Sequence, residues 1–402
     1  MIVGIIGGGA SGMAAALAAA ENAGVQVLLF ERQARVGRKL QATGNGRCNL
    51  SNLHAAVNHY HGEDPSFGSH AIASFDVSAT LNWFQDLGLV TVAEPSGRVY
   101  PYSDQANSVV DVLRFALEKP NIQVLTGCEV TKVRKTGDTF AVTAGEEVYT
   151  CHKLIVACGG LAGTKLGGSM SGYKLLAKFG HHSTRLRPAL VQVKCGWNGV
   201  AALKGVRANC RAQILCDGEL RAESTGELQF TEYGLSGPVI FEVSRDVCTG
   251  GLWSCRLDFL PQMDADALTR LLRAEARAAL PVEELLTGIL HNRLGRVLTR
   301  AAGIRSGVSG ELTDLEITAV CRAVKAFEVE ITEPLGMDSA QVTAGGVLTS
   351  EFDPVTMESR LVKGLFACGE VLDIDGDCGG YNLQWAWSSG RLAGLNAGKE
   401  LV

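Results

Sequence analysis

The sequence lacks the spacings that mark metal and disulfide proteins. No CxxC pair occurs among its twelve cysteines, and its eight histidines show neither HxxxH nor HExxH spacing. Cys151, Cys158 and Cys368 lie in or beside apolar runs, which is typical of free buried thiols in a reducing compartment. We therefore predict no metal site and a cytoplasmic location. The adjacent His181 and His182 are interpreted as a helix end that faces solvent.

Basic membrane-targeting segments and an excess of positive charge are also missing. The first twenty residues carry no charged side chain, but glycines interrupt this run near its start and no basic segment accompanies it. We therefore expect neither a signal peptide nor a membrane span there. The net charge of −5 and the isoelectric point near 6.0 argue against a nucleic-acid or anionic-membrane surface. The expected partner is a small-molecule substrate, and the oligomeric state stays open.

The first thirty-one residues instead have the order of a dinucleotide-binding unit. An apolar run, residues 2–6, is followed by the glycine turn 7–12 and an alanine-rich segment, and a second apolar run, residues 25–30, ends at Glu31. Strand, glycine turn, helix, strand and acid follow one another as a Rossmann unit requires. This pattern predicts an adenine dinucleotide.

Each part of this motif has a physical role. Gly7 allows the tight turn, Gly9 lets the backbone approach a pyrophosphate, and Gly12 lets the helix pack closely on the strand. The N–H groups of the first helical turn then point at the phosphates, with the helix dipole favouring negative charge there. Glu31 is placed to accept both ribose hydroxyls.

The chain is too long for one ordinary domain, and its character changes along its length. Residues 188–261 have mainly strand-like patterns, 262–330 mainly helical ones, and 331–341 a returning strand; within them, 265–279 and 313–324 are expected helices. We predict one FAD-binding domain built from residues 1–187 and 342–402, with residues 188–341 inserted as a substrate domain.

The end of the chain favours FAD over NAD. A terminal apolar strand, 365–368, leads into Gly369 and Glu370, and a diglycine then opens a helix at Tyr381. In FAD enzymes with two dinucleotide-binding domains, this acid binds near the ribitol or pyrophosphate, and the helix N-terminus faces the flavin. No second GxGxxG is present, so NADH or NADPH would dock transiently over the flavin, or another donor would supply electrons.

Several longer motifs resemble one family. They are residues 43–52 (TGNGRCNLSN), 97–101 (GRVYP), 226–238 (GELQFTEYGLSGP) and 369–394 (GEVLDIDGDCGGYNLQWAWSSGRLAG). On these, the chain resembles the bacterial BaiN/YhiN-type FAD-dependent oxidoreductases over essentially its whole length. The resemblance implies an α/β fold, with a Rossmann-like FAD-binding domain, an inserted β-barrel domain and a small helical domain. It also implies reduction of a C=C bond conjugated to a ketone, as in 3-oxo-Δ4 steroid or bile-acid intermediates.

The motifs and the resemblance together predict the residues that bind FAD. They come from the first turn, the segment after its acid, the loop near residue 47, the strand ends near residues 130 and 158, and the start of the last helix. The set is Gly7, Gly9, Ala10, Ser11, Gly12, Glu31, Arg32, Arg38, Lys39, Leu40, Asn45, Gly46, Arg47, Cys48, Asn49, Val130, Ala157, Cys158, Gly159, Gly369, Glu370, Gly380, Tyr381, Asn382 and Leu383. Ser171 departs from the family pattern, which has an acid there.

Three residues are candidates for catalysis, since reducing an enone needs a proton at the α-carbon and a donor to its carbonyl. Tyr381 follows the diglycine, where its phenol could protonate or polarise the substrate; otherwise it is a packing aromatic. Arg47 could polarise a ketone or neutralise the FAD pyrophosphate. Cys48 lies between Arg47 and Asn49, a setting that could lower a thiol pKa, or it fills a tight loop. Two other functions stay open: amine oxidation by the flavin, and a non-enzymatic redox flavoprotein.

Overall fold

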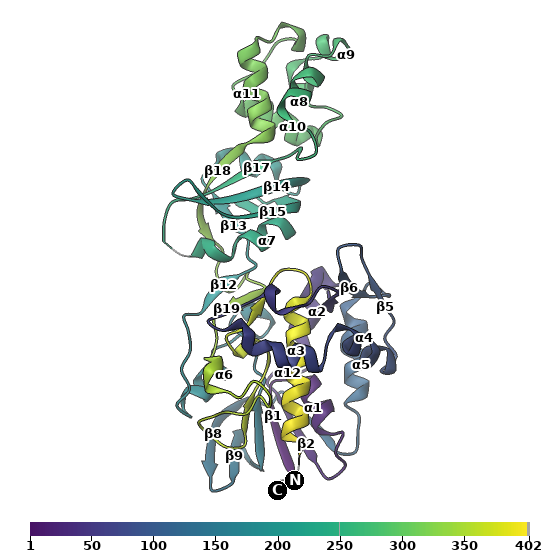
Figure 1. Cartoon of the computed structure of the whole chain (residues 1–402), viewed down its shortest axis with the longest axis vertical. Coiled ribbons are helices and arrows are strands. Elements are labelled where there is room, and N and C mark those ends of the chain that lie inside the picture. Colours follow the sequence, from purple (N-terminus) through teal and green to yellow (C-terminus); the bar gives the residue numbers. More distant parts are fainter. Residues whose placement is uncertain (249, 400–402) are drawn as a thin grey trace. The chain divides into compact units, whose positions relative to one another are not determined.

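The computed structural model describes residues 1–248 and 250–399. They form two compact units: Met1–Arg187 together with the chain from Gln341 onward, and Pro188–Ala340. Strand β12 (Arg187–Ala189) begins where the chain leaves the first unit, and β19 (Val342–Ala344) follows its return. Figure 1 shows both units and labels many of their elements.

The first unit is built on a five-stranded parallel sheet in the order β20-β11-β1-β2-β7. Its strands are β1 (Ile2–Ile6), β2 (Gln26–Glu31), β7 (Ile122–Thr126), β11 (Lys153–Val156) and β20 (Leu365–Ala367). The central strand β1 is almost wholly buried, as expected of a parallel sheet covered on both faces. The terminal strand β20 pairs with β11, so the end of the chain joins the same sheet as its beginning.

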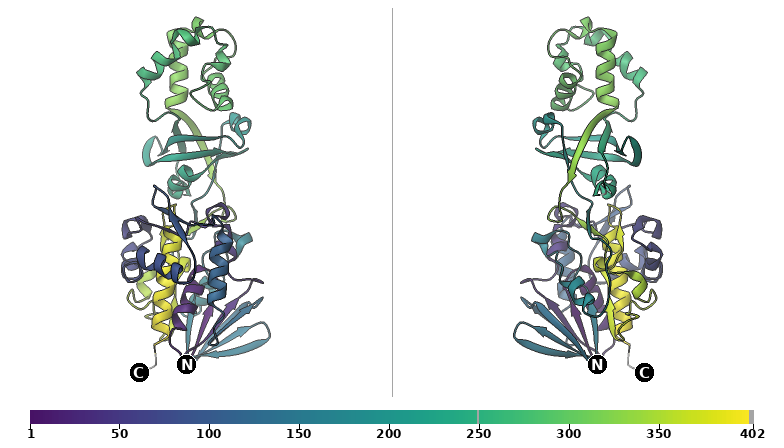
Figure 2. Two further views of the ribbon diagram at one scale, coloured as in Figure 1. Left: turned by 90° about the vertical axis from the view of Figure 1, so that its right-hand side faces the viewer. Right: turned by 90° about the vertical axis from the view of Figure 1, so that its left-hand side faces the viewer.

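Two helices of small residues pack closely in this unit. They are α1 (Ala10–Ala19) and the last helix, α12 (Tyr381–Ala397), which lies beside it in both views of Figure 2. A Cβ added at Gly390 would lie 2.3 Å from the Ser11 carbonyl oxygen, and one at Gly394 would lie 2.3 Å from that of Ala15. Only glycine therefore permits this approach of the two backbones.

Smaller elements complete the first unit. They are the antiparallel sheet β8 (Val130–Thr136), β9 (Thr139–Ala144) and β10 (Glu147–Cys151); the sheet of β3 (Ser51–Asn52), β5 (Thr91–Ala93) and β6 (Arg98–Pro101); the pair β4 (Tyr60–His61) and β21 (Asp375–Gly376); and the helices α2 (Arg38–Ala42), α3 (Ser69–Ser74), α4 (Val77–Asp86), α5 (Ala106–Ala116) and α6 (Ser171–Ala177). The β4–β21 pair joins two segments that are more than 300 residues apart in sequence.

The second unit contains a closed barrel in the order β13-β16-β15-β14-β17-β18. Its strands are β13 (Val193–Cys195), β14 (Arg207–Cys216), β15 (Glu219–Phe230), β16 (Gly234–Ser236), β17 (Trp253–Asp258) and β18 (Phe327–Pro334). Its helices are α7 (Pro238–Val243), α8 (Ala265–Leu272), α9 (Glu275–Ala278), α10 (Asn292–Ala301) and α11 (Asp314–Lys325). The predicted α/β class, with a Rossmann-like domain, a barrel and a helical part, is confirmed.

Three local expectations were wrong. The returning strand expected over 331–341 is instead β18 (Phe327–Pro334), which begins earlier and ends at Pro334. The helix expected over 265–279 is broken at Ala274, whose backbone is extended, so that α8 ends at Leu272 and α9 begins at Glu275. His181 does not face solvent: its imidazole is fully buried, stacks on Phe352 at 4.5 Å and contacts Glu351 at 2.9 Å. Burial lowers the pKa of His181, although Glu351 opposes this shift.

No helix in the described ranges, 1–248 and 250–399, has both the length and the apolar character needed to cross a membrane.

Candidate flavin site

The glycine turn after β1 has the geometry that close backbone packing demands. Gly7 has a φ of 110°, and a Cβ there would lie 2.4 Å from the Ala157 carbonyl oxygen. A Cβ on Gly12 would lie 1.8 Å from the Gly7 carbonyl oxygen. At Gly9, which precedes α1, an added Cβ would meet no described atom within 4 Å. The first N–H groups of α1, which begins at Ala10, have no partner within the helix and favour negative charge at this terminus.

Glu31 lies at the end of β2 and is 9% exposed. One carboxylate oxygen accepts the Gly8 N–H at 2.8 Å, and the other accepts the Gln33 N–H at 2.7 Å. These bonds hold the carboxylate beside the glycine turn. A carboxylate has about four acceptor positions, so acceptor capacity remains for two hydroxyl groups.

We predict that Glu31→Ala weakens FAD binding about ten- to 150-fold, because hydrogen bonds to a charged acceptor are worth roughly 1.5–3 kcal/mol. Titration of the apoprotein with FAD measures this. Glu31→Gln, which keeps the side-chain volume, separates loss of charge from loss of packing. Glu146→Ala, on an exposed turn, is the matched control. Unchanged affinity in both Glu31 variants would show that this residue is not the ribose acceptor.

The segment after Glu31 carries four of the predicted side chains. Arg32 donates to the Gly167 carbonyl at 2.6 Å, and Arg38 to the Gln33 side chain at 2.5 Å. Lys39 pairs with Glu370 at 2.7 Å, which ties α2 to the loop after β20. Leu40 is buried and serves the core.

The following loop contains three consecutive residues with a positive φ, the first of which is Gly44 at 57°. Asn45 has a φ of 56° and Gly46 one of 87°, and a Cβ on Gly46 would meet no described atom within 4 Å. Asn49 lies three residues further on from Gly46, and its Oδ1 is buried with no hydrogen-bond partner among the described residues. A bound ligand or an ordered water that donates a hydrogen bond would satisfy this acceptor.

Arg47 is already paired. Its guanidinium donates to Asp104 and, at 3.2 Å, to Glu94, and it stacks over the Tyr100 ring at 4.1 Å. The hydrogen bond to Asp104 raises the pKa of Arg47, with burial opposing. Because two carboxylates balance this charge, neither a ketone-polarising nor a pyrophosphate-neutralising role follows from the observed arrangement.

Cys48 requires a correction. The sequence suggested a thiol whose pKa is lowered by its neighbours, but the side chain is fully buried. Burial raises the pKa of Cys48 to about 12, and Thr43 opposes only part of this. The residue has a φ of 62° and fills a tight loop, which was the alternative interpretation.

The strand ends at the carboxyl edge of the sheet supply the next group. Ala157 is buried behind Gly7, and the Cys158 thiol donates to the Ile6 carbonyl at 3.5 Å. Gly159 has a φ of 70°, and open space lies where its Cβ would be. Val130, at the start of β8, is buried.

The terminal segment returns to this edge as expected. Gly369 has a φ of 75°, and a Cβ there would lie 2.5 Å from the Ser11 hydroxyl. Glu370 accepts the Thr343 N–H at 2.9 Å in addition to Lys39. Gly380, with a φ of 106°, caps α12; a Cβ would lie 2.2 Å from the Ser51 carbonyl oxygen.

The first residues of α12 are held in place by the preceding loop. Asn382 accepts the Gly376 N–H at 2.8 Å and donates back to its carbonyl at 2.7 Å. Leu383 is half-buried, and the Tyr381 ring is buried. The N–H groups of this seventeen-residue helix begin at Tyr381, so its positive dipole end lies there.

These observations fit FAD. Open space lies beside the backbone at Gly9, Gly46 and Gly159, the α1 N-terminus suits a pyrophosphate, and the buried Asn49 oxygen could accept a hydrogen bond from a ligand. Glu31 is held beside the first turn.

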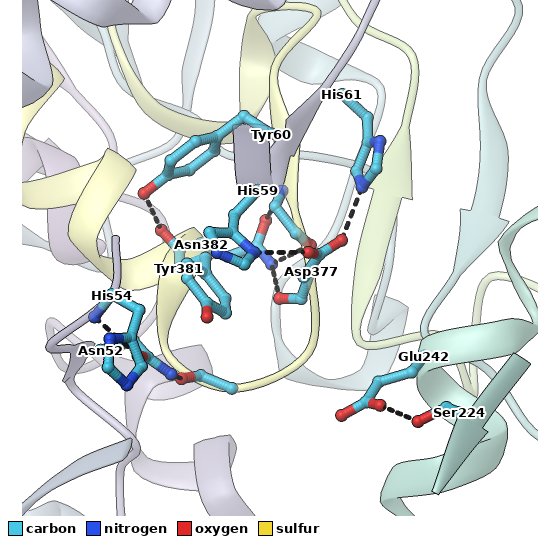
Figure 3. A network of polar contacts seen from close by, with 12 residues as sticks. Asn52, His54, His59, Tyr60, His61, Ser224, Glu242, Asp377, Tyr381 and Asn382 are labelled. Atoms are coloured by element: carbon cyan, nitrogen blue, oxygen red, sulfur yellow. Dashed lines mark hydrogen bonds and ion pairs between the residues drawn. The ribbon is translucent and has the colours of Figure 1, made fainter. Parts of the chain in front are cut away.

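One cluster was missed by the sequence reasoning. His59, which ends η2 (Val57–His59), contacts one oxygen of Asp377 through Nδ1 at 2.9 Å, and His61 contacts the other through Nε2 at 2.6 Å (Figure 3). The His59 ring stacks on Tyr381 at 4.4 Å. Asp377 could have been noticed because it lies in the loop that opens α12, but no spacing pointed to two histidines more than 300 residues away.

No three His, Cys, Asp or Glu side chains in the described part of the chain are arranged to hold a metal ion.

Comparison with known proteins gives consistent results. Residues 1–396 match the family described as "HI0933-like protein Rossmann domain". The chain is 40% identical over 406 residues, 99% of each chain, to the "3-dehydro-bile acid delta(4,6)-reductase" of Clostridium scindens. It is 32% identical over 388 residues, 96% of this chain and 95% of the relative, to the "Ribosomal RNA dihydrouridine synthase" of Escherichia coli. An open flavocytochrome c3 fumarate reductase shares the fold, with a TM-score of 0.50, 17% identity, and coverage of 98% of this chain and 78% of that one.

Proposed function

Because this chain belongs to the HI0933-like Rossmann-domain family and is an FAD-dependent oxidoreductase, we propose that it reduces a C=C bond conjugated to a carbonyl group. The family match and the 40% identical relative confirm the resemblance to the BaiN/YhiN-type oxidoreductases that the sequence motifs indicated. The observation that carries the proposal is the 40% identity, over 99% of both chains, to a protein named as a bile-acid Δ4,6-reductase. The proposed substrate is a 3-oxo-Δ4 steroid or bile-acid type compound, and the proposed electron donor is NADH or NADPH.

FAD, when bound and reduced by the proposed NADH or NADPH, would supply hydride for the β-carbon of such a substrate. The chain supplies the surroundings: α1 and Glu31 would hold the adenosine diphosphate half, and the loops at Asn49 and Gly159 the remainder. The N-terminus of α12 favours negative charge next to it. Tyr381, at this terminus, would donate a hydrogen bond to the substrate carbonyl, where negative charge develops as the hydride arrives.

A second candidate is reduction of a uridine ring in RNA. It is favoured by the 32% identity, over 96% of this chain, to a protein named as a ribosomal RNA dihydrouridine synthase. The two reactions share their chemistry, because the uridine double bond that is lost in dihydrouridine is conjugated to a ring carbonyl. The relatives therefore do not support the expectation that nucleic acid is excluded as a partner. The acidic net charge still disfavours nucleic-acid binding.

Anaerobic mixing of the reduced enzyme with candidate acceptors tests the proposal. We expect testosterone, a 3-oxo-Δ4 steroid, to reoxidise the flavin and to be recovered with its C4–C5 bond saturated. Reoxidation by a uridine-containing ribosomal RNA fragment, and not by the steroid, would select the second candidate. Reduction of the oxidised flavin by benzylamine, with peroxide released in air, would select amine oxidation instead. If none of the three reacts, reductase and oxidase are both contradicted.

A further inference from the structure

The His59–Asp377–His61 cluster is the one group of titratable side chains near Tyr381 that the proposed function has not used. Its side chains are partly accessible, at 29% for His59, 39% for Asp377 and 36% for His61. It is also rigidly built. The Asp377 N–H donates to the His59 carbonyl at 3.0 Å, and Asn382 donates to the Asp377 carbonyl at 3.3 Å.

The carboxylate is placed to stabilise positive charge on either imidazole. Burial would raise the pKa of Asp377, but hydrogen bonds from His61 and His59 outweigh it and lower that pKa. Asp377 therefore stays ionised at neutral pH, and one negative charge faces two imidazoles.

Other titratable groups also face the cluster. The Tyr381 ring covers one face of His59, and the Tyr60 ring meets Tyr381 edge-on at 6.3 Å. The Tyr60 hydroxyl donates to the Tyr381 carbonyl at 3.0 Å, and burial raises the pKa of Tyr60, so this phenol stays protonated. Asp373 accepts the Glu63 N–H at 3.1 Å beyond the end of β4.

We propose that His59 is the proton donor of the reductive reaction, with Asp377 as its positioning residue and His61 as the link to solvent. This inference rests on the proposed function. The proposal is based on two geometric observations. His59 directs Nδ1 to Asp377, so Nε2 is the ring nitrogen that could donate a proton to the substrate. The His59 ring is also stacked on Tyr381, the residue that opens α12.

The step balances in atoms and electrons. Hydride forms the new C–H bond at the β-carbon, and the π-electron pair moves towards the carbonyl oxygen. The Nε2–H bond of the His59 imidazolium then breaks, and its proton forms the C–H bond at the α-carbon. His59 is left neutral, with Nδ1–H still donated to Asp377. A solvent proton, taken up at the exposed edge of His61 or at His59, restores the cluster.

The test is the pH dependence of flavin reoxidation in the reduced holoenzyme, with testosterone or the uridine RNA fragment as acceptor. We expect His59→Gln to slow reoxidation about 10²-fold or more, because a positioned acid contributes roughly 10²–10⁴-fold. We expect Asp377→Asn to change the pH dependence of the rate, because a neutral amide then replaces the charged acceptor that both imidazoles contact. His54→Gln, an exposed imidazole of the same segment, should leave rate and profile unchanged.

A second measurement does not depend on turnover. Carbon-13 NMR of labelled aspartate should show a higher pKa for Asp377 when His59 and His61 are both replaced by glutamine. The histidine contacts that lower this pKa are then lost, whereas burial, which raises it, remains. If the wild type reacts but His59→Gln and Asp377→Asn keep its rate and profile, the proton-donor assignment is overturned while the proposed function stands. If the wild type reacts with neither acceptor, the proposed function is overturned and the assignment with it. An unchanged Asp377 titration would also overturn the assignment.

Discussion

Gly12→Ala is expected to abolish FAD retention and to destabilise the first unit. The added Cβ would lie 1.8 Å from the Gly7 carbonyl oxygen, and a backbone atom cannot rotate away as a side chain can. Overpacking typically costs about 1–3 kcal/mol and occasionally more, and we expect a cost at or above the top of this range. The turn that presents the α1 amides would shift, so the purified protein should be colourless.

Gly9→Ala is the informative partner of this variant. An added Cβ at Gly9 meets no described atom within 4 Å, so the apoprotein should keep its thermal midpoint and lose FAD affinity. Gly336→Ala, also in open space, should change neither. Thermal unfolding of the apoproteins and FAD titration measure both effects. If Gly12→Ala folds and binds FAD normally, the close packing of α1 on the strand is not required. If Gly9→Ala binds FAD normally, no ligand atom approaches that backbone.

Tyr381→Phe is expected to keep FAD bound and to slow substrate-dependent flavin reoxidation about 10²- to 10³-fold, the usual cost of removing one donor to a developing oxyanion. Flavin reduction by NADH or NADPH should be nearly unchanged, because that half-reaction needs no donor to the substrate carbonyl. The alkaline limb of the pH profile should stay in place, which separates this role from that of His59. Stopped-flow absorbance of the two half-reactions measures these outcomes.

Tyr60→Phe is the matched control, since it removes a neighbouring phenol whose hydroxyl bonds only the Tyr381 backbone among the contacts described. We expect reoxidation within a few-fold of the wild type. If both half-reactions of Tyr381→Phe slow equally, or neither slows, the ring is a packing aromatic stacked on His59. The carbonyl donor would then have to be sought among other groups at the start of α12.

The structure also shows surroundings of two of the three catalytic candidates that the sequence did not reveal. Cys48 lies between an arginine and an asparagine in the sequence, but its pKa depends on solvent exposure, which the neighbouring residues do not reveal. Arg47 meets Glu94 and Asp104, which lie 47 and 57 residues away. His181 is likewise buried by a residue far away in the sequence, Phe352, so its local sequence does not reveal its burial.

The sequence by itself determined the features that depend on local sterics and periodicity. The glycine turn, the apolar strands, the acid at Glu31 and the diglycine before α12 predict a Rossmann fold and FAD, because φ preferences and burial periods act within a few residues. Only the tertiary structure decided which charged groups meet. Strand pairing of β4 with β21 brings His59 and Asp377 together across 318 residues, and burial sets which thiols and imidazoles can ionise. The candidate proton-donating group depends on such contacts between distant segments, so the sequence alone does not reveal it.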